Sequence, residues 1–340
     1  MKKIRFLLYP LAILYDVVTS IRNFFFDYGI FKEQKFDIPV ITVGNLSVGG
    51  TGKTPQIEYL VRLLQGDYKV AVLSRGYRRK TKGFILVNSK HTANDVGDEP
   101  LQYFKKFQNI TVAVDTDRVN GIQQLQQGVN PAIILLDDAY QHRNVKAGFS
   151  ILLTKYKDLF VNDFLLPTGN LRESKKGAKR TDIILVTKCP ENLTTTAQLS
   201  IKNKLSRYQK PVFFTSISYA ATLKGANKLQ VKDLKNYRIL LVTGIANPKP
   251  MLNFLGEKEI HFTHLKYSDH HHFSEQEIKE IQDTFDAIDD KEKVILTTEK
   301  DYMRLHSRLK QVSYLPIVTY VIANQLNFDN VITDYVKQSQ

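Results

Sequence analysis

The sequence has few of the residues that hold small folds together by covalent or metal bonds. Its 340 residues include one cysteine, Cys189, and no tryptophan. A single thiol cannot form an internal disulfide, and it excludes the cysteine clusters that bind structural zinc. We therefore expect Cys189 to be a small buried residue at the end of a strand, in a protein of a reducing compartment such as the cytoplasm.

The sequence also lacks a hydrophobic run long enough to cross a membrane. The best candidate extends from Phe6 to Tyr15 and stops at Asp16, short of the ~20 residues that a spanning helix needs. No small-residue cleavage site follows, which argues against a secretory signal. The pattern of residues 1–30 instead predicts a helix. This helix lies in a membrane interface or, alternatively, packs on the protein's own core. Its apolar face comprises Ile13, Leu14, Val17, Val18, Ile21, Phe24 and Phe25.

Negative charge is in short supply as well. Lysine and arginine total 48 against 34 aspartates and glutamates, a net charge of +14. Such an excess attracts nucleic acid, acidic lipid or phosphorylated substrates. The basic residues gather in two loops, at 75–80 and 167–180, without the interleaved aromatic residues of a single-strand platform. We therefore expect no nucleic-acid partner.

A glycine-rich loop is the clearest motif that is present. The stretch 38–54 reads IPVITVGNLSVGGTGKT, a buried strand that leads through glycines into a helix. Backbone N–H groups of such a loop surround a phosphate, the lysine reaches the β- and γ-phosphates, and the threonine can bind Mg²⁺. Serine stands at position 47, where the usual P-loop has glycine. The predicted ATP-binding residues are Ser47, Val48, Gly49, Gly50, Thr51, Gly52, Lys53 and Thr54.

Strand-like and helical segments alternate after this loop. Apolar runs near 69–74, 110–114, 132–136, 149–154, 182–187 and 211–216 are typical of strands buried on both faces. This pattern predicts a P-loop NTPase-like parallel sheet with helices on both faces, over residues 31–217. A polar connection at 218–237 and a smaller α/β domain at 238–340 follow.

Acidic residues and one histidine cluster complete the candidate site. Asp137 and Asp138 end a buried strand, so either could hold Mg²⁺ beside the loop. Asp98 and Glu99 form an acidic turn in which a carboxylate could accept a proton from an alcohol. His270 begins a histidine triplet after Asp269, and we expect one ring to face a cleft near that aspartate.

Together these segments resemble the tetraacyldisaccharide 4′-kinase family, the lipid A kinases of Gram-negative bacteria. The matching segments are VGNLSVGGTGKTP (43–55), LSRGY (73–77), VGDEP (96–100), LLDDAYQH (135–142), LLPTGNLRE (165–173), VTGIANP (242–248), SDHHHF (268–273) and TTEKDYMRL (297–305). They follow the family's order over nearly the whole chain. Ser47 is normal for this family, whereas Ala139 stands where the family more often has glycine.

The resemblance implies transfer of the ATP γ-phosphate to the 4′-hydroxyl of tetraacyldisaccharide 1-phosphate, which forms lipid IVA. It implies Asp98 as the general base, supported by His270, with Lys53 also catalytic. Arg172 would meet phosphate charge. It further implies a peripheral location at the cytoplasmic face of the inner membrane and makes no prediction of oligomeric state. The Mg²⁺ ligands would come from Thr54, Glu99, Asp137 and Asp138.

Two other classes also fit parts of the sequence. A P-loop GTPase or partition-type ATPase, acting as a switch on nucleic acid or membrane, would explain the glycine loop and the charge. The sequence has no N-K-x-D guanine-reading motif, which argues against the GTPase. The other class is a non-catalytic membrane-docking protein with a degenerate nucleotide site.

Overall fold

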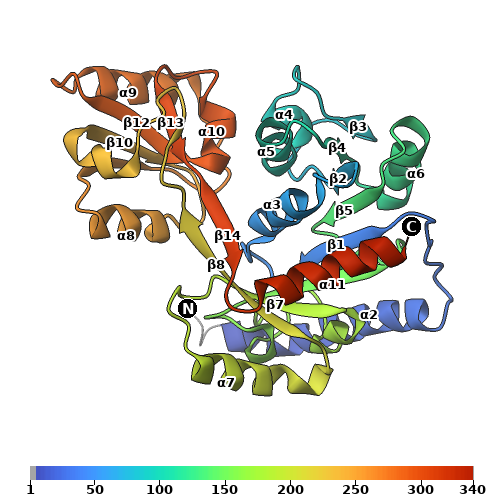
Figure 1. The fold of residues 1–340 in the computed structure, drawn as a ribbon. Helices are drawn as coiled ribbons and strands as arrows, with labels where there is room; N and C mark the ends of the chain where they lie inside the picture. The colour runs from blue at the N-terminus through green and yellow to red at the C-terminus, as the bar shows by residue number, and fades with distance from the viewer. Residues whose placement is uncertain (1–4, 340) are drawn as a thin grey trace.

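The protein folds into two lobes of unequal size, each built on one sheet (Figure 1). A computed structural model describes residues 5–339. The larger lobe contains a nine-stranded sheet and the smaller a five-stranded sheet. This arrangement confirms the predicted α/β class with a large, mainly parallel sheet.

The large sheet places the glycine-rich loop near its centre. Its strands, in spatial order, are β14 (Ile317–Val321), β8 (Val212–Tyr219), β7 (Ile183–Thr187), β6 (Phe149–Lys155), β1 (Val40–Asn45), β5 (Ile133–Asp137), β2 (Val70–Ser74), β4 (Thr111–Val114) and β3 (Ile85–Leu86). The strands from β8 to β4 pair in parallel, and only the edge strands β14 and β3 are antiparallel. Since β1, β5 and β2 are neighbours, the loops at their carboxyl ends meet at one edge, where open α/β sheets bind ligands.

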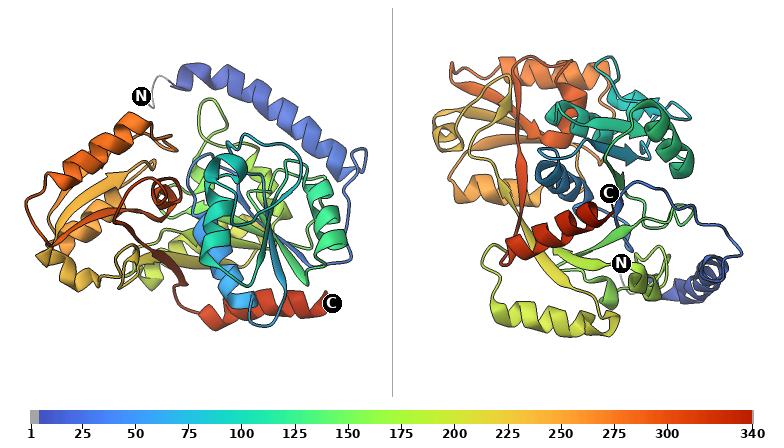
Figure 2. Two further views of the ribbon diagram at one scale, coloured as in Figure 1. Left: turned by 90° about the horizontal axis from the view of Figure 1, so that it is seen from above. Right: turned by 45° about the vertical axis from the view of Figure 1, so that its right-hand side comes forward.

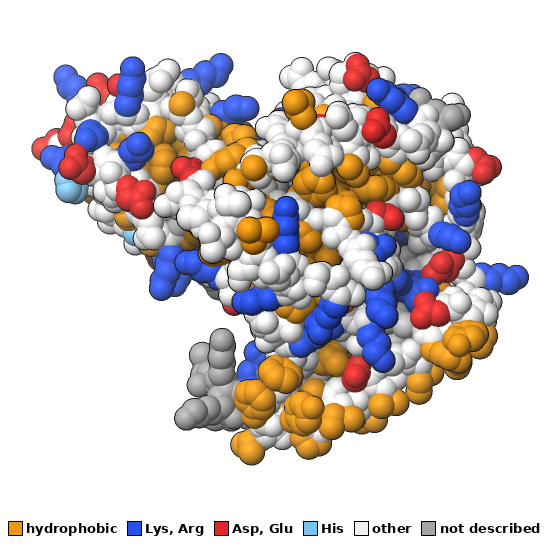
Figure 3. Space-filling view, turned by 60° about the horizontal axis from the view of Figure 1, so that its bottom comes forward, with side chains coloured by type: hydrophobic (Ala, Val, Ile, Leu, Met, Phe, Trp, Pro, Cys, Tyr) orange, Lys and Arg blue, Asp and Glu red, His pale blue; other side chains and the backbone are white. Residues whose placement is uncertain are grey.

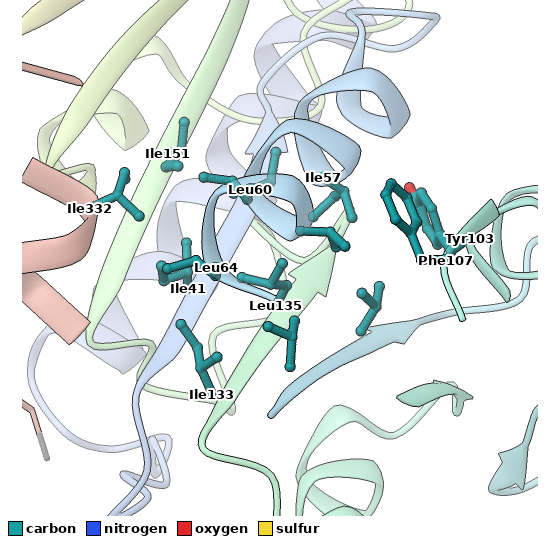
Figure 4. Packing of buried hydrophobic residues seen from close by; sticks show 14 of the residues in the cluster. Ile41, Ile57, Leu60, Leu64, Tyr103, Phe107, Ile133, Leu135, Ile151 and Ile332 are labelled. Carbon is teal, nitrogen blue, oxygen red and sulfur yellow. The ribbon is translucent and has the colours of Figure 1, made fainter. Parts of the chain in front are cut away.

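Helices cover both faces of this sheet because its central strands are apolar on both sides. Ile41 and Ile133 point to one face, where they pack with Leu60 and Ile332 (Figure 4). That face carries α3 (Lys53–Leu64), α5 (Asp98–Lys106) and α11 (Gln325–Gln338). The opposite face carries α6 (Arg118–Gly128) and α7 (Thr195–Leu205), while the short helix α4 (Ala93–Val96) leads into α5.

The smaller lobe repeats the layered plan on a smaller scale. Its strands, in spatial order, are β11 (Phe262–Lys266), β10 (Arg238–Thr243), β12 (Lys293–Thr298), β13 (Val312–Leu315) and β9 (Lys224–Gly225). Its helices are α8 (Lys249–Glu257), α9 (Glu275–Asp286) and α10 (Glu299–Leu305). Short 3₁₀ segments of the two lobes are η1 (Phe6–Leu8), η2 (Phe160–Asn162), η3 (Lys175–Arg180), η4 (Ser206–Tyr208) and η5 (Val231–Asn236).

Sheet pairing differs from the expected boundaries at two places. The smaller domain was expected to extend over 238–340, but Pro316 separates β13 from β14, and β14 pairs with β8 of the large sheet. Residues from Ile317 onward therefore belong to the large lobe. The expected connection at 218–237 is also part of the small lobe, because Leu223 and Leu234 are fully buried in its core.

A buried ion cluster joins the two lobes. The ammonium of Lys106 on α5 lies 2.6 Å from Glu58 Oε2 on α3 and 2.7 Å from Glu299 Oε1 on α10. All three side chains are less than a tenth exposed. Ionised groups this deeply buried stay charged only when they are paired, so the contact between α5 and α10 depends on this lysine.

The N-terminal helix α2 (Tyr9–Asp27) extends along the outside of the large lobe (Figure 2). Its predicted apolar face is largely exposed, with Leu14 61%, Val18 59% and Ile21 49% accessible. Figure 3 shows these side chains as a hydrophobic band along one rim, with lysine and arginine side chains beside it. The expectation that this face packs on the protein's own core is therefore wrong. No helix within residues 5–339 is both long and apolar enough to span a bilayer.

Candidate active site

The glycine-rich loop leads directly from β1 into α3. Gly49 and Gly52 have φ angles of +95° and +91°, which side-chain-bearing residues rarely adopt. Gly52 is the N-cap of α3 and offers no side chain to the first N–H groups of the helix. Those donors and the positive end of the helix dipole therefore remain available for an anion. Pro55 lies in the first turn, as expected.

A second loop, which carries Arg172, braces the first. Val48 N donates to Asn170 O at 2.7 Å, and Arg172 N donates to Leu46 O at 2.7 Å. On the other side, Lys188 Nζ donates to Gly50 O at 2.8 Å. The predicted phosphate-binding residues 47–54 are thus held at the carboxyl edge of the sheet by backbone contacts that need no ligand.

Three predicted charges meet beside this loop. Lys53 Nζ lies 3.5 Å from Asp138 Oδ1 and donates to Asn45 Oδ1 at 3.1 Å. Arg172 lies 3.1 Å from the same carboxylate oxygen. Although burial alone would raise it, the charges and hydrogen bonds of Lys53 and Arg172 hold the pKa of Asp138 below its usual value. Asp138 is therefore an ionised carboxylate between two cations.

The neighbouring Asp137 has a different environment. It is only 5% exposed, and its Oδ2 accepts hydrogen bonds from Ser74 at 3.3 Å and Tyr103 at 3.2 Å. Its Oδ1 is buried without a hydrogen-bond partner. Burial, followed by the negative charges of Asp138 and Glu99, raises the pKa of Asp137 to about 7.

Asp98 and His270 meet across the two lobes. Asp98 is the first residue of α5, is 2% exposed, and lies 3.0 Å from Nδ1 of His270. Arg304 of α10 donates to both of its oxygens, at 2.6 and 2.9 Å. Burial alone would raise the pKa of Asp98, but the hydrogen bonds from His270 and Arg304 outweigh it and lower the pKa below its usual value. Asp98 is therefore a carboxylate that is already ionised.

Backbone geometry explains how Asp98 reaches this position. Gly97 has a φ of +95°, and a Cβ on it would lie 3.2 Å from Gly76 Cα and from Tyr77 O. Only glycine allows the turn before α5 to pack this closely against the basic loop after β2. His270 also has a positive φ, +57°, and its N–H donates to Gly244 O at 3.1 Å.

Comparison with known proteins gives this geometry its context. The sequence pattern of the LpxK family, described as tetraacyldisaccharide-1-P 4'-kinase, matches residues 4–337. This chain belongs to the tetraacyldisaccharide 4′-kinase family. It is 51% identical over 345 residues to the tetraacyldisaccharide 4′-kinase of Flavobacterium johnsoniae, with 100% of this chain and 99% of that protein covered. It is 53% identical to that of Flavobacterium psychrophilum, with the same coverage.

A solved member of the family shares the fold. The crystal structure of "apo" form LpxK from Aquifex aeolicus in complex with ATP superposes with a TM-score of 0.80 at 29% identity. The alignment covers 98% of this chain and 99% of that one. The tetraacyldisaccharide 4′-kinase resemblance of the sequence is thereby confirmed over both lobes.

One expected contact of the histidine triplet is wrong. Asp269 was expected near the histidine that faces the cleft, but its side chain is exposed and the carboxylate beside His270 is Asp98. The next ring, His271, turns the other way and lies 2.8 Å from Glu277 on α9. Consecutive residues point in different directions, so the triplet does not act as one group.

For several residues of the site, no role was predicted from the sequence. Gln141 donates to Asn45 O at 3.0 Å and to Glu173 Oε1 at 2.9 Å. Burial and the positive charges of Arg118 and Arg75 lower the pKa of His142 to about 4, so this ring is neutral. Arg304 lies inside the matched segment 297–305, which was the available signal for it. Tyr103 lies outside every motif, and no sequence signal indicated it.

Proposed function

We propose that this chain transfers the γ-phosphate of ATP to the 4′-hydroxyl of tetraacyldisaccharide 1-phosphate, the lipid A biosynthesis step that forms lipid IVA. Membership of the tetraacyldisaccharide 4′-kinase family supports the reaction. The observation that supports the residue roles best is the Asp98–His270 pair, at 3.0 Å, which the two lobes form together. A phosphoryl-transfer enzyme needs such a base near a phosphate site.

In this proposal the residues from Ser47 to Thr54 hold the ATP phosphates. Lys53 neutralises charge that develops on the transferred phosphoryl group, and Arg172 contributes a second cation. Both now contact Asp138, at 3.5 and 3.1 Å. When ATP binds, its phosphates would compete with Asp138 for these two cations. The Asp138 carboxylate would then be available to bind Mg²⁺.

The acidic residues at the end of β5 fit a Mg²⁺ ion. Asp137 Oδ1 is buried without a partner and its carboxyl retains a proton up to about pH 7, which is expected where a cation is to be bound. Thr54, Glu99, Asp137 and Asp138 would hold the ion. Bound Mg²⁺ would neutralise phosphate charge. Within residues 5–339 no three acidic, histidine or cysteine side chains form a metal cage by themselves, and Mg²⁺ usually takes one or two carboxylates plus substrate phosphates.

Asp98 is proposed to accept the proton of the 4′-hydroxyl. The substrate oxygen then forms its bond to the γ-phosphorus as the bond from that phosphorus to the β,γ-bridging oxygen breaks, and ADP leaves with that oxygen. A carboxylate accepts about four hydrogen bonds, and Asp98 receives three, two from Arg304 and one at His270. One acceptor position therefore remains for the hydroxyl.

Phosphate transfer from radiolabelled ATP tests the proposal. Purified protein with the lipid disaccharide 1-phosphate should yield labelled lipid, and Asp98→Asn should yield little. Label released only as inorganic phosphate, with no labelled lipid, would instead support a switch ATPase. GTP in place of ATP tests the GTPase alternative, and we expect it to be a poor donor.

We further propose that the chain is a peripheral protein at the cytoplasmic face of the inner membrane, held by α2. Leu14 and Val18 on its apolar face are 61% and 59% exposed, and such a face gains free energy by entering the acyl boundary of a bilayer. The opposite side of the helix is already bound, since Tyr15 donates to Arg172 O at 2.8 Å and Asn23 to Glu173 at 3.1 Å. Membrane contact would therefore lie beside the site that receives a lipid.

Vesicle flotation tests this location. A Leu14→Glu/Val18→Glu variant should lose binding to vesicles that contain anionic lipid, because two charges would enter the apolar boundary. Its KM for the lipid should rise while its KM for ATP stays unchanged. Gln123→Glu/Gln127→Glu is the matched control, because it adds two glutamates at exposed positions of α6 and leaves α2 unchanged. Equal binding of both variants would contradict the proposal.

A further inference from the structure

Both ring nitrogens of His270 have partners. Nδ1 lies 3.0 Å from Asp98 Oδ2, and Nε2 lies 2.8 Å from the ammonium nitrogen of Lys300. Lys300 is the second residue of α10, and its ammonium also lies 3.3 Å from Glu99 Oε1. The lysine was part of a matched segment but had no role in the expected chemistry.

The chemistry of these partners selects one tautomer of the ring. An ammonium has three N–H donors and no acceptor, so Nε2 must accept the hydrogen bond from Lys300. The neutral imidazole then carries its proton on Nδ1. That proton points at Asp98, whose two carboxylate oxygens both accept hydrogen bonds from Arg304. In the other tautomer, the lone pair of Nδ1 would face a carboxylate oxygen at 3.0 Å, which is repulsive.

Other contacts restrict the orientation of the His270 ring and of its backbone. Tyr77 packs edge-on against it, with ring centroids 5.4 Å apart. Arg304 donates to the carbonyl oxygen of His270 at 2.6 Å, and the backbone N–H is bound to Gly244 O. The backbone and ring plane are thus fixed, and Asp98 at Nδ1 and Lys300 at Nε2 favour the same tautomer.

We propose that Lys300 is a positioning residue that holds the His270 ring at Nε2, so that Nδ1–H stays directed at Asp98 and orients it toward the acceptor hydroxyl. This role rests on the proposed function of Asp98 as the base. His270 then holds the base in place and does not itself take the substrate proton. The proton of the 4′-hydroxyl ends on Asp98.

Nitrogen-15 NMR of histidine-labelled protein tests the tautomer without any turnover. The full-length chain is compared with Lys300→Met, which removes the donor, and with Lys300→Arg, which keeps one. His270→Gln identifies the resonances of this ring among the eight histidines. We expect Nδ1 protonated and Nε2 unprotonated in the unchanged protein and in Lys300→Arg. In Lys300→Met Nδ1 should stay protonated, because Asp98 still accepts from it, but the Nε2 resonance should shift because its hydrogen bond from the ammonium is lost.

Kinetics supply the second measurement. Lys300→Met should lower kcat roughly 10- to 100-fold, the usual cost of losing a partner that orients a histidine, with KM for ATP unchanged. Lys300→Arg should restore most of the loss. Lys279→Met, on the exposed side of α9, is the control and should change neither the NMR spectrum nor kcat.

Two outcomes would overturn the inference. Unchanged His270 shifts in Lys300→Met would mean that the lysine does not hold the ring. A shifted Nε2 resonance with full kcat would mean that this contact does not matter for transfer. If Asp98 proves not to be the base, Asp98→Asn retains activity, whereas the NMR result for Lys300 still stands or fails by itself.

Discussion

Replacing Asp137 should make the protein more stable at high pH while it removes activity. This carboxyl is buried at the end of β5, where only Oδ2 has hydrogen-bond donors and Oδ1 has none. Without a metal, ionising it places a charge in a dry site near two other carboxylates. Asp137→Asn keeps the shape and the acceptor oxygen but removes the charge.

The magnitude follows from the pKa. Burial raises the pKa of Asp137 from 3.8 to about 7, so the folded protein holds this proton to higher pH than the unfolded chain does. The stability that this retained proton contributes is therefore fully present below about pH 4 and is lost as pH rises through about 7. The total loss is about 4 kcal/mol, at 1.36 kcal/mol per pH unit. The new amide N–H₂ at the Oδ1 position costs about 1 to 2 kcal/mol. Near pH 8.5 the variant should be more stable by about 2 to 3 kcal/mol.

Urea unfolding in EDTA, at about pH 5 and about pH 8.5, measures this difference. Asp138→Asn is the matched control, because the pKa of Asp138 is lowered by Lys53 and Arg172 despite its burial. That carboxyl contributes stability above the unfolded pKa, so its loss should destabilise the protein at both pH values. Identical pH dependence of unfolding in the unchanged protein and Asp137→Asn would refute the reasoning. Saturating Mg²⁺ and ATP should reverse the order of stability.

Three further predictions concern the charges around the site. Lys53→Met should abolish phosphoryl transfer with little change in circular dichroism or Tm, because the lysine neutralises phosphate charge and packs little core; substantial turnover would contradict its role. Asp98→Ala should remove most of kcat and His270→Ala roughly 10²- to 10⁴-fold, while the double variant should be hardly slower than Asp98→Ala. Multiplicative losses in single-turnover rates would mean that the two act separately. Lys106→Met should lower the free energy of unfolding by about 3 to 5 kcal/mol, because it leaves the buried carboxylate of Glu299 on α10 without a cation, although Glu58 keeps Arg62 at 3.2 Å; unchanged urea unfolding would show that the cluster is dispensable.

Local patterns predicted much of the large lobe. Runs such as 132–136 and 182–187 are apolar on both faces, so they predict strands of a parallel sheet that helices cover on both sides. The observed bounds of β5 and β7 agree with these runs to within one residue. The glycine loop and Asp137 were predictable because their order along the chain places them at one edge of such a sheet. The apolar face of α2 was predictable from the spacing of its residues. Whether that face is exposed or buried was not, because this depends on how the rest of the chain packs.

The contacts between lobes could not be derived from local pattern. Nothing in the run 312–321 indicates that Pro316 separates strands of different sheets, because each half is an ordinary apolar segment. The pairing of Asp98 with His270 joins residues 172 positions apart, and it came from the family resemblance rather than from spacing. Arg304 and Tyr103 show the same limit, since their partners are fixed only when α5 and the strand ends are in place.

The small lobe supplies the hydrogen-bond donors of Asp98, the proposed base, and does more than cover the site. Asp98 lies on α5 of the large lobe, but the groups that hold it ionised, Arg304 and His270, both come from the small lobe. The chain passes from the large sheet to the small one after β8 and returns at β14, and these two strands pair along five residues of each. A motion at this edge would change the distance between α5 and α10. Separation of the lobes would remove these donors from Asp98, so the proposed base requires the closed arrangement, and closure would also exclude water that could accept the phosphate in place of the sugar.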